Sequence, residues 1–278
     1  MVFEKKIEEI YRKNAFKRYD DTGAVFYFSV KDFPGLKKEE YSFKGSAGQR
    51  LQGYFYYYDA PVTDRIVVFD HGLGGGHRAY LKEIERLAKH GYPVFAYDHT
   101  GCMESEGENT NGLSQSLNDL NACITELKRI DRLKGRSFSV MGHSWGAFSA
   151  MNIVALHPDI THVVALSGFI SVEQMLKQNF TGILAGYRKP MWELERRSNP
   201  DYVDFNAVES LKNTHAKVLL IYSADDKTVD AKYHFNLLKT ALAGKKNIRL
   251  MEVQGKGHNP NYTEEAINTH ISEISEAK

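Results

Sequence analysis

The chain has 278 residues, and 36 lysines and arginines against 35 aspartates and glutamates give it a net charge of +1. This balance argues against general electrostatic binding to nucleic acid or to an anionic membrane, which needs a basic excess or a basic face. The hydrophobic fraction of 42% and the charged fraction of 26% are those of a globular protein. A chain of this length can bury a large core without disulfides, so Cys102 and Cys123 need not pair.

The sequence contains no signal for secretion or for membrane insertion. Its first residues carry charges where a signal peptide would have an apolar segment. No run of about 18 apolar residues occurs. We therefore expect a cytoplasmic protein. We also expect residues 1–278 to form a single domain.

The first third of the chain predicts a helix and then β structure. Spaced apolar positions in residues 4–18 are typical of an amphipathic helix. Strands are expected at residues 25–30, 40–44 and 51–58, with a turn at 45–49 that makes the last two antiparallel.

From residue 61 onward, short apolar strands alternate with helical stretches. Strands are expected at 65–69, 93–97, 137–141, 162–166, 217–222 and 247–253, and helices at 78–90, 114–133, 147–157, 230–242 and 263–274. Apolar strands separated by helices are typical of a parallel sheet covered on both faces. Ligands of such sheets bind beyond the carboxyl ends of the strands, so the chemistry is expected there.

One of these strand ends carries a nucleophile motif. The strand at 137–141 runs into Gly142-His-Ser-Trp-Gly146, and a helix follows. G-x-S-x-G between strand and helix forms a tight turn in which glycines leave room for an exposed serine hydroxyl. The motif is short enough to occur by chance, but its context favours Ser144 as a nucleophile.

A serine nucleophile needs a base and a third group that orients the base. His258, in the loop after the last strand, is the best placed of the eleven histidines. His71 and His143 precede glycine turns and are interpreted as structural. Two carboxylates, Asp225 and Asp226, follow the strand at 217–222 and compete for the orienting role.

The glycine-rich run from His71 to Gly76 follows the first parallel strand. Backbone N–H groups in such a loop can stabilise an oxyanion, and we assign this role to Leu73 and to Trp145, directly after the serine. A dinucleotide-binding loop is excluded, because G-x-G-x-x-G counted from Gly72 would need glycine at His77. With no H-E-x-x-H spacing, we expect neither a metal nor an organic cofactor.

These motifs resemble those of the α/β-hydrolase superfamily over roughly residues 40–278. The chain is most similar to the branch of monoacylglycerol lipases, small carboxylesterases and serine aminopeptidase-like hydrolases. The resemblance implies an eight-stranded, mostly parallel sheet with helices on both faces and a cap inserted over the active site. It also favours Asp226 over Asp225, because the spacing D-x-x-V matches the family pattern. The branch often carries D-x-R-G-x-G-x-S, where this chain has Thr100 and Met103 instead of the arginine and the second glycine.

The cap can be located from chain length. The stretch between Gly168 and Lys217 is several times longer than the roughly dozen residues of an ordinary crossover. We therefore place the cap at about residues 169–210. Most of its apolar residues are expected to pack the cap onto the body, and the candidates for an acyl pocket are Met175, Phe180 and Trp192.

The sequence thus predicts a serine hydrolase of the carboxylesterase or lipase type, acting on esters of small or medium acyl chains through an acyl-enzyme. A thioesterase, an amidase or peptidase and an acyltransferase would carry the same triad, and the fold does not choose among them. A ligand sensor on a hydrolase scaffold is disfavoured by the intact set of serine, aspartate and histidine. The expected partner is a small, partly apolar acyl substrate, with no nucleic acid and no stable membrane insertion.

Overall fold

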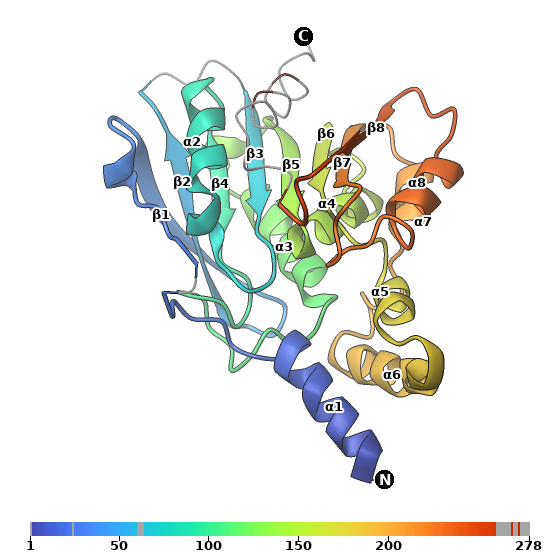
Figure 1. The fold of residues 1–278 in the computed structure, drawn as a ribbon. Coiled ribbons are helices and arrows are strands. Elements are labelled where there is room, and N and C mark those ends of the chain that lie inside the picture. Colours follow the sequence, from blue (N-terminus) through green and yellow to red (C-terminus); the bar gives the residue numbers. More distant parts are fainter. Residues whose placement is uncertain (1, 24, 60–63, 260–267, 269–271, 273–278) are drawn as a thin grey trace.

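The computed structural model describes residues 2–23, 25–59 and 64–259, together with residues 268 and 272. Its centre is one sheet with the strand order β1-β2-β4-β3-β5-β6-β7-β8 (Figure 1). The six strands from β3 to β8 pair in parallel, whereas β2 is antiparallel to both β1 and β4. This arrangement confirms the predicted eight-stranded, mostly parallel sheet.

The elements lie close to the predicted ranges. The strands are β1 (Lys37–Lys44), β2 (Arg50–Tyr57), β3 (Arg65–Asp70), β4 (Val94–Tyr97), β5 (Ser137–His143), β6 (His162–Leu166), β7 (Lys217–Ser223) and β8 (Ile248–Val253). The helices are α1 (Val2–Ala15), α2 (Leu81–Lys89), α3 (Gln115–Leu127), α4 (Trp145–Leu156), α5 (Val172–Asn179), α6 (Arg188–Ser198), α7 (Ala207–Lys212) and α8 (Phe235–Ala241). Short 3-10 helices lie at Val30–Asp32, His77–Tyr80, Asp131–Leu133 and Gly182–Tyr187. The helix predicted at 263–274 lies outside the described residues, apart from 268 and 272.

The strand predicted at residues 25–30 is wrong. The segment is irregular and ends in the 3-10 helix that begins at Val30. Its main chain bonds to Arg78 instead of to a strand: Phe28 N donates to Arg78 O (3.2 Å), and Arg78 Nε donates to Phe28 O (3.0 Å). Apolar residues here suggested a strand, but they pack as rings, with Phe26 and Phe28 4.7 Å apart.

The central strands are buried on both faces, as a parallel sheet covered by helices requires. Along β3, Ile66 and Val68 belong to the core that includes α3 and α4. The alternate residues, Val67 and Phe69, belong to the core under α2. The two helical layers therefore hold the sheet between them and leave its carboxyl edge for the site.

The segment between β6 and α7 holds α5, the helix Gly182–Tyr187 and α6. These helices lie with α1 at one end of the sheet (Figure 1). The following helix, α7, returns to the body, where Ser210 Oγ donates to Asn152 Oδ1 of α4 (2.8 Å). In the described part of the chain, no helix has the length and apolar character needed to cross a membrane.

Candidate active site

Ser144 lies at the sharp turn between β5 and α4. Its backbone has φ 56° and ψ −111°, a left-handed region that is costly for a residue with a side chain. The glycines of the motif make the turn possible. A Cβ on Gly142 would lie 2.2 Å from Gly146 O, and a Cβ on Gly146 would lie 2.1 Å from Asp70 O. Both glycines are therefore sterically required, and the turn presents the serine beyond the carboxyl edge of the sheet.

The structure brings Ser144, His258 and Asp226 together from three different loops. His258 Nε2 lies 2.8 Å from Ser144 Oγ, and His258 Nδ1 lies 2.8 Å from Asp226 Oδ2. The other oxygen of Asp226 accepts the N–H groups of Thr228 (2.8 Å) and Val229 (2.9 Å). Burial alone would raise the pKa of Asp226, but its bonds to His258 and to these N–H groups lower it. A fixed carboxylate therefore faces the imidazole, and the imidazole faces the serine.

The neighbouring carboxylate, Asp225, points elsewhere. Its Oδ1 accepts the hydroxyl of Ser223 (2.5 Å) and the N–H groups of Lys256 and Gly257 (3.2 Å each). These bonds hold the loop that leads into His258. The geometry thus gives the two aspartates separate tasks, with Asp226 on the imidazole and Asp225 on the backbone before it.

His143 supports the site through hydrogen bonds of both its ring nitrogens. Its Nε2 lies 2.7 Å from the main-chain oxygen of His258, so this nitrogen carries the proton and donates it. His143 Nδ1 then accepts from the Tyr80 hydroxyl (2.8 Å), which itself accepts from Gly72 N (3.3 Å). Burial and the nearby His258 lower the pKa of His143 to about 3, so the ring is neutral. One chain of hydrogen bonds therefore joins the histidine loop to the glycine-rich loop.

His71 fixes the orientation of the peptide that carries the Leu73 N–H. His71 Nδ1 donates to Gly72 O (2.8 Å), while its Nε2 accepts from His99 N (3.0 Å). Burial lowers the pKa of His71 to about 3 and keeps it in this neutral form. The C=O of Gly72 and the N–H of Leu73 belong to one trans peptide and point in opposite directions. Holding the carbonyl therefore aims the N–H.

The second expected donor, the Trp145 N–H, lies in the first turn of α4, where amides have no partner within the helix. Its loop and the Leu73 loop follow β5 and β3, which are paired neighbours. The two N–H groups thus come from adjacent strand ends. The indole is buried, and its Nε1 donates to Leu113 O (2.6 Å).

Trp145 packs against a buried charge network that the sequence analysis did not predict. His99 Nε2 lies 2.9 Å from Asp70 Oδ1, and Nδ1 lies 3.3 Å from Asp119 Oδ2. Burial alone would lower the pKa of His99, but these carboxylates raise it to about 9. Its ring centroid is 4.7 Å from that of Trp145. A charged imidazole paired with two aspartates therefore supports the residue that follows the serine.

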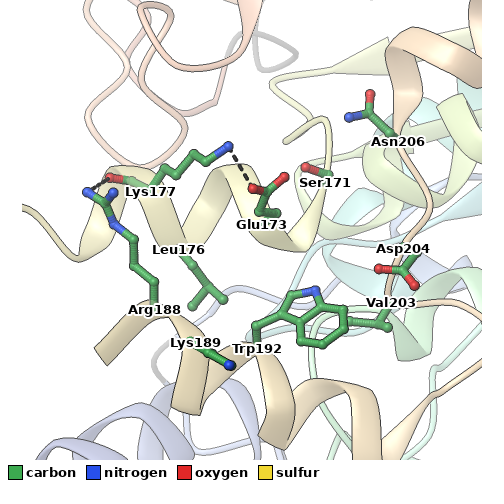
Figure 2. A pocket seen from close by; sticks show the side chains of 10 residues that line it. All are labelled: Ser171, Glu173, Leu176, Lys177, Arg188, Lys189, Trp192, Val203, Asp204 and Asn206. Atoms are coloured by element: carbon green, nitrogen blue, oxygen red, sulfur yellow. Dashed lines mark hydrogen bonds and ion pairs between the residues drawn. The ribbon is translucent and has the colours of Figure 1, made fainter. Parts of the chain in front are cut away.

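The three candidates for an acyl pocket have different surroundings. Trp192 lines a cavity of about 420 Å³, together with Leu176 and Val203 (Figure 2). All the residues lining this cavity lie between positions 171 and 206, inside the range of about 169–210 in which the cap is expected. Phe180 is buried, and its ring is 6.1 Å from that of Tyr11 in α1. Met175 is half-buried against the main core.

Neither cysteine has the environment of a nucleophile. Cys102 and Cys123 are both buried free thiols, and burial raises the pKa of each. Among the described residues, no group of three or more histidines, cysteines, aspartates or glutamates could hold a metal ion.

The sheet topology, the serine turn and the contacts around it are those of an α/β-hydrolase. A family model described as "Serine aminopeptidase, S33" matches residues 61–207, more than half of the chain. The chain belongs to this family of hydrolases.

The chain is also similar to known proteins in sequence and in structure. An uncharacterized protein of Rickettsia prowazekii is 27% identical over 207 residues, which are 73% of this chain and 84% of that protein. A putative carbamate hydrolase, RutD, of Agrobacterium fabrum is 29% identical over 94 residues, 33% of either chain. The esterase Pf2001 of Pyrococcus furiosus has a TM-score of 0.71 over 91% of this chain and 97% of its own, at 21% identity. At that identity the likeness shows the fold alone.

Proposed function

We propose that this hydrolase cleaves carboxylic esters of small or medium acyl chains through an acyl-enzyme on Ser144. The observation that carries the proposal is the continuous contact from Ser144 Oγ through His258 to Asp226, with 2.8 Å at each step. A histidine within this distance of the hydroxyl can act as general base. Asp226 holds the imidazole in the tautomer whose free nitrogen faces the serine.

The reaction has two steps. In the first, His258 takes the proton of Ser144 Oγ as the oxygen attacks the ester carbonyl, and the N–H groups of Leu73 and Trp145 receive the oxyanion. The carbon–oxygen bond to the alcohol then breaks, and His258 gives its proton to the leaving alcohol. In the second step, water loses a proton to His258, attacks the acyl-enzyme and releases the acid, and the proton returns to Ser144.

We place the acyl selectivity in the cap, at about residues 169–210 of the single hydrolase domain. The cavity beside Trp192 is lined by apolar Leu176 and Val203 as well as by polar and charged side chains, and its volume of about 420 Å³ suits a small ligand. Met175 and Phe180 are the other proposed pocket residues. The proposed substrate is a small, partly apolar acyl compound, which suits an enzyme with a net charge of +1. The proposed reaction needs no cofactor, and the proposed location of the enzyme is the cytoplasm.

A fluorophosphonate that labels activated serines tests the enzyme class. The wild-type protein should be labelled on Ser144, the variant Ser144→Ala should not be labelled, and His258→Ala should be labelled far more slowly. Ser46→Ala is the matched control, because Ser46 is exposed in the β1–β2 turn. A folded wild-type protein that takes no label would favour a non-catalytic ligand sensor.

A panel of substrates tests the bond that is cleaved. p-Nitrophenyl esters of rising chain length should be hydrolysed faster than the corresponding thioesters and anilides. Trp192→Ala should change the order of preference among chain lengths. Faster turnover of the anilides would identify an amidase or peptidase instead. If Trp192→Ala leaves the order of preference among chain lengths unchanged, Trp192 does not take part in acyl selection.

A further inference from the structure

Glu195 of α6 is a buried carboxylate that joins three parts of the chain. Its side chain has no solvent exposure. Oε1 accepts the hydroxyl of Tyr11 in α1 (2.6 Å), and Oε2 accepts the N–H of Leu113 in the loop before α3 (2.8 Å). These partners are neutral groups, so the burial of the carboxylate gains little stability from charge pairing. A buried carboxylate held in this way calls for a reason other than stability.

The loop before α3 is built around this carboxylate. Asn111 and Gly112 have φ angles of 55° and 99°, both left-handed. A Cβ on Gly112 would lie 2.4 Å from Oε2 of Glu195, so the carboxylate fills the space beside the glycine. The loop thereby turns the Leu113 N–H toward the carboxyl group of Glu195, just before the N-terminus of α3.

The same residue, Leu113, contacts Trp145 through its carbonyl. Trp145 Nε1 donates to Leu113 O (2.6 Å). The indole ring also packs on the rings of His99 and His71, with distances of 4.7 and 6.4 Å between ring centroids. Two hydrogen bonds thus connect Glu195 to the residue directly after the serine. A shift of α6 that withdrew the carboxylate would leave the Leu113 N–H without its acceptor and free the backbone that holds the indole.

We propose that Glu195 is a positioning residue for the oxyanion hole, which couples the inserted α5–α6 segment to the Trp145 N–H through Leu113. The inference rests on the proposed function, in which that N–H receives the oxyanion. It means that the site is fully assembled only while α6 and α1 are docked on the loop before α3. The cap would then tune the reactivity of Ser144 as well as enclose the substrate.

Glu195→Gln is the direct test, because it keeps the shape of the side chain but leaves only one oxygen to accept from Tyr11 and Leu113. The matched control is Glu193→Gln on the same helix, where Glu193 is only partly buried and bonds to Arg196 (2.9 Å). Glu195→Gln should lower the acylation rate of Ser144 about tenfold and change KM for a short ester less than about twofold. Glu193→Gln should change neither. Tyr11→Phe, which keeps the carboxylate, should lower the acylation rate in the same direction by a smaller factor.

The indole N–H signal of Trp145 in a ¹H–¹⁵N spectrum gives a readout that a purely structural role would not move. The chain has two tryptophans, so Trp192→Phe identifies the signal. Glu195→Gln should shift it, and Glu193→Gln should not. A folded Glu195→Gln protein with an unshifted signal and wild-type acylation would overturn the proposal, as would a lower melting temperature with unchanged acylation. If the wild-type protein takes no acyl group at all, the proposed function fails, while the shift of the indole signal still tests the coupling.

Discussion

The imidazole of His143 donates a hydrogen bond to the main-chain carbonyl of His258, with 2.7 Å between Nε2 and O. His143, which directly precedes Ser144, therefore holds the backbone of His258, whose ring faces the Ser144 hydroxyl. Since Tyr80 links the other nitrogen of His143 to Gly72, the same ring also connects to the glycine-rich loop. The distance between Ser144 and His258 thus depends on a side chain that contacts neither reacting atom.

Replacing His143 should therefore impair turnover more than substrate binding. His143→Phe keeps a ring of similar size but cannot donate to His258 O, so the histidine loop loses one anchor. We expect kcat for a p-nitrophenyl ester to fall about tenfold or more with little change in KM. Tyr80→Phe should have a smaller effect in the same direction. Wild-type kcat in a folded His143→Phe protein would contradict the role assigned to the ring.

The two adjacent aspartates should differ sharply in their effect on rate. Asp226→Asn replaces the carboxylate that fixes the imidazole tautomer, so kcat should fall by about 10³- to 10⁴-fold. Asp225→Asn weakens only the anchors to Lys256 and Gly257, and we expect a much smaller loss. Steady-state kinetics of the two variants under one set of conditions measures the ranking. The reverse order would mean that the acid is misassigned.

The sequence predicted the sheet, because a sheet of this kind depends on local signals. It also pointed to Ser144, His258 and Asp226, which the structure joins in this order by contacts of 2.8 Å at each step. Apolar strands alternate with helices along the chain, and the glycines of the serine motif lie within two residues of the serine. The supporting residues could not be predicted in the same way. His99 and Glu195 act through partners about 20 and more than 80 positions away, Asp119 and Leu113, and only the fold brings these pairs together. The segment at 25–30 was mispredicted for a related reason, since its partner is Arg78 and not a strand.

The glycines of the serine turn should tolerate no side chain. Gly146→Ala would place a Cβ 2.1 Å from the Asp70 carbonyl, which belongs to a buried strand and cannot move aside. We expect a loss of about 3 kcal/mol or more in the free energy of unfolding. Gly135→Ala is the control: its φ of 81° is left-handed and adds backbone strain, but its Cβ would meet nothing within 4 Å. Urea unfolding should show a cost of about 1 kcal/mol for that variant, and equal costs for the two would refute the steric argument.

Stability should fall as the pH drops below about 6.5, because buried histidines resist protonation in the folded state. Burial lowers the pKa values of His71, His143 and His234 to about 3, whereas unfolded histidines titrate near 6.5. Between these values the unfolded chain binds more protons, so each group costs about 2 kcal/mol of stability by pH 5. Burial raises the pKa of Glu195 to about 7, and two aspartates raise the pKa of His99 to about 9; both groups act in the opposite direction. They are outnumbered, because burial also lowers the pKa values of His157 and His162 to about 4.

Urea unfolding at pH 7.5 and pH 5 measures this dependence. The free energy of unfolding should fall by a few kcal/mol between the two pH values. His234→Gln should make this fall smaller by about 2 kcal/mol, which is the contribution of one buried histidine. His90→Gln, at an exposed site, should leave it unchanged. A stability that is the same at both pH values would contradict the neutral state assigned to the buried rings.

Trapping the acyl-enzyme tests the central claim most directly. The protein is mixed with a p-nitrophenyl ester, quenched in acid within the first turnovers, digested and analysed by mass spectrometry. Our account predicts the added mass of the acyl group on the peptide that contains Ser144, at much lower occupancy in His258→Ala and absent in Ser144→Ala. Ester hydrolysis that continues in Ser144→Ala, or an acyl group found on another residue during turnover, would contradict it.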